Sequence, residues 1–130
     1  MSVHEVLQRV KQLVDDCEVI IRDGRLAVLT RDVDLAERVL EHSKNVIAQT
    51  KGVLAEAKRV IEAHDQREDR LYKYVSTYYR MLVMVSMPYA AMVLREVAVI
   101  LEKHGRGEKA GEARSIAGNF EEASSTLRPQ

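Results

Sequence analysis

Hydrophobic residues recur every three or four positions along most of the chain, which is the spacing of one face of an α-helix. The first such run begins after Ser2, and Glu5 follows three residues later in a capping-box pattern. This pattern predicts a helix over residues 2–23, ended by Gly24 in the left-handed conformation.

Residues 24–31 break the pattern and are predicted to form a short connection. We expect the apolar side chains of this connection to pack beneath the core. Thr30 or Asp32 then caps a long helix predicted over residues 32–65, because short polar side chains at this position accept the free backbone N–H groups of the first turn.

The long helix over residues 32–65 contains four successive heptads. Each heptad opens with Val followed by Leu or Ile, which predicts a ridge of branched side chains. Mostly small residues form a second row, three positions before each Val, and the members of this row are Ala36, Ser43, Thr50, Ala57 and His64. The pattern indicates a trench beside the ridge, into which a neighbouring helix fits closely.

A second long helix is predicted over residues 67–104. A continuous helix through both segments would exceed roughly 80 Å at 1.5 Å per residue, so we expect a turn at the polar run 64–70. Pro88 is expected to kink the second long helix or to end its first half. A shorter and more polar helix over residues 108–127 closes the chain.

Composition favours one fold class. The chain has 130 residues, 46% of them hydrophobic, with only two prolines and six glycines. A chain of this length forms one domain with a modest core. We therefore predict a single all-α domain, a helical bundle of three or four helices built on a long helical hairpin.

Charge is balanced, with 20 basic and 20 acidic residues, so its placement is more informative than its sum. Three lysines recur at the sixth position of the heptads, on an outer face with small residues such as Ala48 and Gly52. Between Glu41 and Glu62 this outer face is expected to carry no negative charge. Small residues between cations let a helix lie against a phosphate backbone. An ordinary solvated helix face remains the alternative interpretation.

A second basic stripe is predicted on the helix that follows, opposite its apolar side. Two basic faces in a chain without net charge favour a polyanion partner. The candidate phosphate contacts from both stripes are Lys44, Lys51, Lys58, Arg59, Arg67, Arg70, Lys73 and Arg80.

Residues 81–94 are apolar on nearly every face, but they are too few to span a bilayer. Burial among the protein's own helices and burial against another copy are the two interpretations. Tyrosine and methionine are favoured where subunits meet. The candidate subunit-interface residues are Tyr72, Tyr79, Met81, Met84, Met87 and Met92.

No catalytic signature is recognisable in the sequence. Residues 59–64 space Arg and His as in RNases of the HEPN type, but Val60 stands where a polar residue usually follows the Arg. The Glu-x-x-His pair of di-iron helical bundles is missing. Residues 105–113 are rich in glycine, but no strand is predicted before them and no Lys-Ser or Lys-Thr follows a glycine, so they do not form a phosphate loop. Cys17 is on an apolar stripe and is expected to be a buried thiol. We therefore expect no enzyme activity, cofactor, metal or small-molecule substrate.

The chain resembles the α-helical capsid proteins of filamentous archaeal viruses in three features. These are long helices with a seam of small residues, basic outer faces, and a composition with 13 Arg and two Asn. The resemblance covers mainly residues 32–101. It implies a self-assembling virion subunit from a hyperthermophilic setting. In that family, paired subunits wrap double-stranded DNA with long helices and hold it in the A form. The partners would be DNA and the same or a paralogous subunit.

The alternative is a cellular helical adaptor or small subunit that binds a protein partner through its Val/Ile and Tyr surfaces. Charged residues interrupt the N-terminus, so no secretory signal peptide is expected. The predicted location is the virion, or the cytoplasm if the protein is an adaptor. Neither hypothesis decides whether a membrane is involved.

Overall fold

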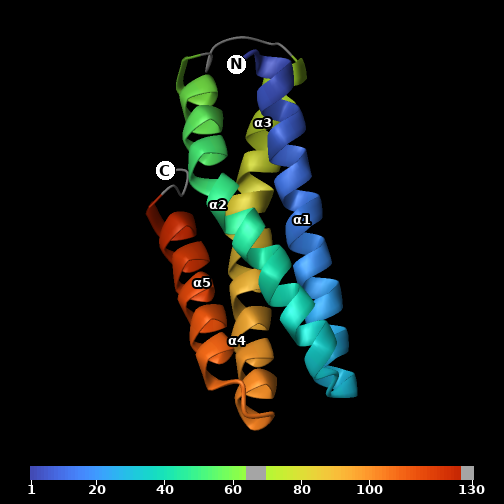
Figure 1. Ribbon diagram of the computed structural model, residues 1–130. Coiled ribbons are helices and arrows are strands. Elements are labelled where there is room, and N and C mark those ends of the chain that lie inside the picture. The colour runs from blue at the N-terminus through green and yellow to red at the C-terminus, as the bar shows by residue number, and fades with distance from the viewer. Residues whose placement is uncertain (64–69, 127–130) are drawn as a thin grey trace.

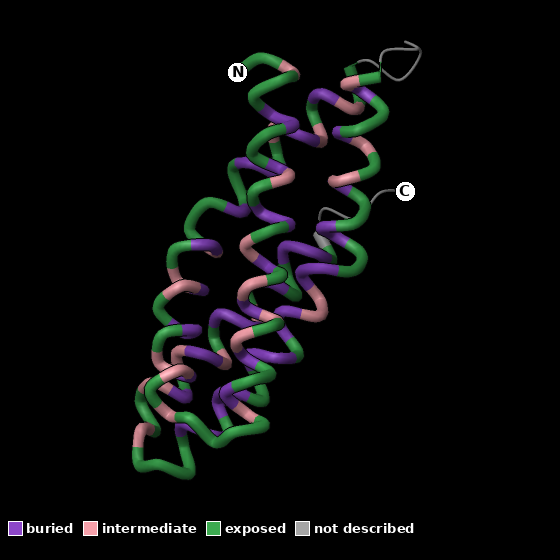
Figure 2. Tube along the Cα trace, turned by 90° about the vertical axis from the view of Figure 1, so that its right-hand side faces the viewer, coloured by how far each residue is buried: buried purple, intermediate pink, exposed green. Residues whose placement is uncertain are grey.

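The computed structural model describes residues 1–63 and 70–126, and these form four helices and no strand (Figure 1). The all-α prediction is confirmed. The helices run alternately down and up the bundle, and each turns one apolar stripe toward the common core (Figure 2).

The first helix, α1 (Val3–Thr30), begins as its sequence predicts. The Ser2 hydroxyl accepts the Glu5 backbone N–H at 3.2 Å. The predicted end at Gly24 and the predicted connection over residues 24–31 are wrong, because α1 continues to Thr30. Arg31, with φ 54°, supplies the left-handed residue that ends α1.

Gly24 has a packing role instead of a capping one. It is buried in the middle of α1, and a Cβ built on it would lie 2.4 Å from Val93 Cγ1 and 3.3 Å from Val97 Cγ2. The missing side chain therefore lets α1 approach α4. A glycine inside a helix costs about 1 kcal/mol relative to alanine, and close helix packing offsets this cost.

Gly24→Ala is expected to lower the free energy of unfolding by about 1–3 kcal/mol, because overpacking a fixed core forces its neighbours apart. Gly52→Ala is the matched control, since Gly52 is exposed on α2 and a Cβ placed there would meet no atom within 4 Å. That control is expected to raise stability by up to about 1 kcal/mol. Urea unfolding of both variants measures the change in the free energy of unfolding. Equal changes for Gly24→Ala and Gly52→Ala would contradict the close packing of α1 on α4 at Gly24.

The second helix, α2 (Val33–Ala63), is capped by Asp32, whose carboxylate accepts the Leu35 backbone N–H at 3.0 Å. The heptad interpretation is confirmed for the trench. Ala36, Ser43, Thr50 and Ala57 are all buried. The two hydroxyls need no outside partner, because Ser43 and Thr50 each donate to the backbone carbonyl four residues earlier.

The third helix consists of α3 (Arg70–Met81), a π-helical segment η1 (Leu82–Ser86) and α4 (Met87–Lys103). The predicted disturbance at Pro88 takes the form of this π segment. In π register the Val83 carbonyl faces the nitrogen of Pro88, which carries no hydrogen. The buried Ser124 hydroxyl of α5 donates to that carbonyl instead.

The fourth helix, α5 (Gly107–Thr126), packs along α4. Its buried face includes Ala110, Ala113 and Ala117, which allow a close approach, and Phe120 fills the space between the helices. Because α5 has 20 residues while α3, η1 and α4 together have 34, α5 ends partway along the bundle (Figure 1). Beyond that level, among residues 1–63 and 70–126, only α1, α2 and α3 form the bundle, and we call this part the three-helix half.

Length and composition would allow one helix, Arg70–Lys103, to cross a membrane. However, 56% of its most apolar window is buried inside the bundle. Core helices of soluble proteins pass the same test, so this feature carries no conclusion about location.

Candidate nucleic-acid interface

The three heptad lysines of α2 have different surroundings. The Lys44 ammonium lies 3.0 Å from Glu41 Oε1 and 3.1 Å from Glu112 Oε2 of α5. These hydrogen bonds raise the pKa of Lys44 and hold it as a bridge between α2 and α5. Lys44 is therefore engaged within the protein, in contrast to its predicted role as a phosphate contact.

Arg59 is also paired. Its guanidinium lies 2.5 Å from Glu56 Oε2, one turn earlier on α2, and this contact lowers the pKa of Glu56. The expectation that no negative charge lies on this outer face is wrong, because Glu56 and Glu112 both reach it. Surface pairs of this kind are weak, about 0–1 kcal/mol, so a phosphate could still compete for Arg59.

Further ion pairs hold α5 in place. Lys109 lies 2.8 Å from Glu37 of α2, and Arg106 bonds the same carboxylate, which lowers the pKa of Glu37. On the other side of α5, Glu121 pairs with Arg95 and Arg114 pairs with Glu102. Charge near α5 thus serves to attach this helix to α2 and α4.

Those of the other predicted phosphate contacts that the structure describes have no acidic partner among residues 1–63 and 70–126. Arg67 lies outside the described residues. We call the remaining five the basic surface, and they are Lys51, Lys58, Arg70, Lys73 and Arg80. All except Lys58, which is partly buried, are exposed.

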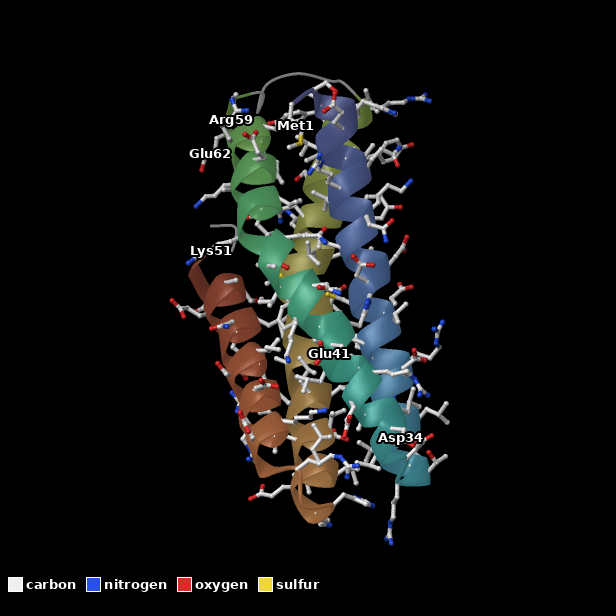
Figure 3. All side chains as sticks on the ribbon, in the orientation of Figure 1. Met1, Asp34, Glu41, Lys51, Arg59 and Glu62 are labelled. Atoms are coloured by element: carbon white, nitrogen blue, oxygen red, sulfur yellow. The ribbon has the colours of Figure 1, made fainter. Side chains whose placement is uncertain are left out.

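Most of the basic surface belongs to the three-helix half, and Lys51 lies at its border, where it lines a groove together with Glu122 of α5. Lys51 lies beside the end of α5, and Arg59 and Glu62 mark the far end of α2 (Figure 3). α3 lies beside this part of α2 and carries the other three cations of the basic surface. Tyr74, 52% exposed, lies between them in the sequence and adds an aromatic face. The structure thus places the five cations of the basic surface, which come from both predicted stripes, toward the same end of the bundle.

A groove of about 620 Å³ adjoins this surface where α5 ends. Its walls are mostly apolar, with Lys51 on the α2 side and Glu122 on the α5 side. Ala48 and Ala55 of α2 also line it. The small residues predicted between the lysines therefore border an open groove as well as solvent.

The predicted subunit-interface residues divide into two groups. Met81, Met84 and Met92 are exposed on the outer side of the third helix, Met84 by 53%. Tyr72, Tyr79 and Met87 are buried in the protein's own core, which corrects their assignment to an interface. Burial is also the main cause that raises the pKa of Tyr79.

Two exposed apolar positions were not predicted. Leu26 and Leu29, expected beneath the core, are 50% and 78% exposed at the end of α1. The expectation failed because it assumed a connection that folds back, whereas the helix continues. Helical spacing beyond Gly24 was the available signal, since the buried Ile20 and Ala27 are seven residues apart.

Nothing in the described part of the chain assembles reactive groups. Among those residues, no three His, Cys, Asp or Glu side chains lie close enough to hold a metal ion. Cys17 is buried as predicted, and burial, with Asp16 and Glu18 nearby, raises the pKa of its thiol to about 12. A thiol with that pKa is not a nucleophile near neutral pH. His64, the second residue of the RNase-like motif, lies outside the described residues.

The features that remain are therefore surfaces: five cations without acidic partners in the described ranges, a groove beside them, and exposed methionines. Comparison with protein-family models, with curated proteins and with solved structures finds no match to this chain.

Proposed function

We propose that this protein is a non-enzymatic structural subunit that assembles with copies of itself and coats double-stranded DNA through sequence-independent phosphate contacts. A capsid protein of a filamentous virus, as the resemblance of its sequence implies, is the specific form of this proposal. The virion would then be its location.

The basic surface is the observation that supports this proposal. From Arg70 to Arg95 the chain contains no Asp or Glu, although the whole chain has as many acids as bases. Lysine and arginine side chains without local carboxylates gain most from a phosphate backbone, because binding releases its condensed counterions. No base-reading element is required, since phosphate contacts carry no sequence information.

The test combines binding with microscopy. Purified protein is titrated into a linear DNA duplex of random sequence at several salt concentrations. With four or five phosphate contacts, the logarithm of the association constant is expected to fall with the logarithm of salt with a slope of about −4. Negative-stain micrographs are expected to show regular filaments that contain DNA. Absence of DNA binding at roughly 50 mM salt would refute the proposal.

A helical adaptor is the second candidate, and the groove between α2 and α5 favours it. A mostly apolar groove of about 620 Å³ has a size typical of binding sites. An adaptor would remain as discrete particles in the same micrographs and would show no salt-dependent affinity for DNA.

A further inference from the structure

The groove between α2 and α5 has mostly apolar walls. Its volume is about 620 Å³, and Ala55 of α2 and Ala123 of α5 are among the residues that line it. Thr50 also lines it, but its hydroxyl already donates to the Val46 carbonyl at 2.7 Å. A ligand that fills the groove must therefore be largely apolar, because a polar group placed against these walls would lose its hydrogen bonds to water.

Two opposite charges border the groove. Lys51 lies on the α2 side and Glu122 on the α5 side, next to the neutral amide of Asn119. Both charged side chains are exposed, and neither has an ion-pair partner among residues 1–63 and 70–126. They therefore do not neutralise each other across the groove. One ligand can meet a cation on one side and an anion on the other.

The neighbouring charges do not alter this pattern. Glu112 of α5 is paired with Lys44, and Glu121 is paired with Arg95. Lys58 lies one heptad farther along α2 and is not among the residues that line the groove. The two charges at the groove itself thus remain one of each sign.

The length of the groove suits an alkyl chain. The residues of α2 that line it run from Ile47 to Ala55, eight positions apart, which is about 12 Å along the helix axis. An extended chain advances about 1.2 Å per bond, so about ten methylene groups span this distance. An apolar lining with a few polar groups is also typical of small-molecule sites.

We propose that this groove binds a single-chain amphiphile with a zwitterionic head. The alkyl chain lies along the apolar walls, an anionic phosphate of the head lies against Lys51, and a cationic ammonium group lies against Glu122. A head with only one charge would leave one of these side chains unpaired or repelled. This inference is independent of DNA binding and self-assembly, although an occupied groove would engage Lys51, one of the five cations of the basic surface.

Three probes with the same dodecyl chain test the proposal: dodecylphosphocholine, dodecyl phosphate and dodecyltrimethylammonium. Each is titrated below its micelle concentration into the full chain, and isothermal calorimetry measures its affinity. Dodecylphosphocholine is expected to bind about fivefold more tightly than either probe with one charge, which is the factor that one close ion pair in water supplies.

Phosphocholines of increasing chain length test the apolar part of the site. Their affinity is expected to rise by up to about fourfold per methylene group, because each one is removed from water. The rise is expected to level off at about ten to twelve carbons, where the chain has filled the groove.

Two charge variants locate the head group. Lys51→Gln is expected to weaken dodecylphosphocholine and dodecyl phosphate about fivefold, without weakening dodecyltrimethylammonium. Glu122→Gln is expected to weaken dodecylphosphocholine and dodecyltrimethylammonium by a similar factor, without weakening dodecyl phosphate. Both positions are exposed, so both variants are expected to fold, which circular dichroism checks.

A blocking variant locates the chain. Ala55→Leu places a larger side chain in the groove and is expected to weaken all three probes at least about tenfold, because the chain loses much of its contact with the walls. Gly52→Leu is the matched control. Gly52 lies three residues earlier on α2, is not among the lining residues, and a Cβ placed on it would meet no atom within 4 Å. This control is expected to leave binding unchanged.

Three results would overturn the proposal. Equal affinities for all three probes, unchanged by either charge variant, would contradict a zwitterionic head. Binding that Ala55→Leu does not weaken would place the amphiphile elsewhere on the protein. Absence of binding by every probe would refute the site and leave the groove to a protein partner. Because none of these readouts involves DNA, each result leaves the proposed function to its own test.

Discussion

Replacement of Lys51, Lys58 and Lys73 by glutamate is expected to lower the affinity for duplex DNA at least 100-fold at low salt. A cation and a phosphate at about 4 Å attract each other by about 1 kcal/mol in water. Reversal removes this attraction and adds a repulsion of similar size. Three sites thus amount to several kcal/mol before screening, and each 1.4 kcal/mol is tenfold in affinity. The salt slope is expected to decrease by about three.

The matched control reverses three other cations, Arg31, Arg38 and Lys103. They are exposed, they have no acidic partner in the described part of the chain, and they lie toward the opposite end of the bundle. Both triple variants change the net charge by the same amount. Filter binding or fluorescence anisotropy over a salt series measures both. Equal losses of affinity would show that net charge, not the basic surface, controls binding.

Phe120→Ala is expected to lower the free energy of unfolding by about 3–5 kcal/mol. Phe120 is the only Phe of the chain and is fully buried. Truncation would leave a cavity between α5 and the rest of the bundle, and the small residues of α5 cannot fill it. Domains are stable by about 5–15 kcal/mol in total, so a large share of the stability depends on this one ring.

Guanidinium unfolding followed by circular dichroism measures the loss. Ser115→Ala on the exposed side of α5 is the control and is expected to change stability by no more than about 0.5 kcal/mol. A loss below about 1 kcal/mol for Phe120→Ala would mean that α5 does not pack as described.

Local sequence patterns alone were sufficient for the fold class, both long helices, the capping role of Ser2 and the buried small residues of α2. They left Thr30 and Asp32 as alternative caps of α2, and the structure shows Asp32. These features are local, because each depends on side chains within a few turns of one helix. The end of α1 could not be predicted in this way. A glycine is equally consistent with a helix stop and with a point of close contact, and only the position of Val93 on α4 decides between them.

Pro88 illustrates the same division. Its sequence predicts a disturbed helix, because proline lacks an N–H group. In the structure this disturbance is a π segment, and the free carbonyl of Val83 accepts a hydrogen bond from Ser124, 41 residues farther along the chain. This outcome depends on where α5 lies.

The sequence by itself determined that three lysines recur at heptad spacing on one side of α2 and that no Asp or Glu occurs from Arg70 to Arg95. Which of these cations can reach a partner was decided only by the tertiary structure. Lys44 lies within reach of Glu112 because α5 packs closely on that level of α2, whereas a groove separates Lys51 from Glu122 near the end of α5 and Lys58 lies two turns farther along α2. Helical spacing places side chains on a face, but the length and position of a neighbouring helix determine which of them it neutralises.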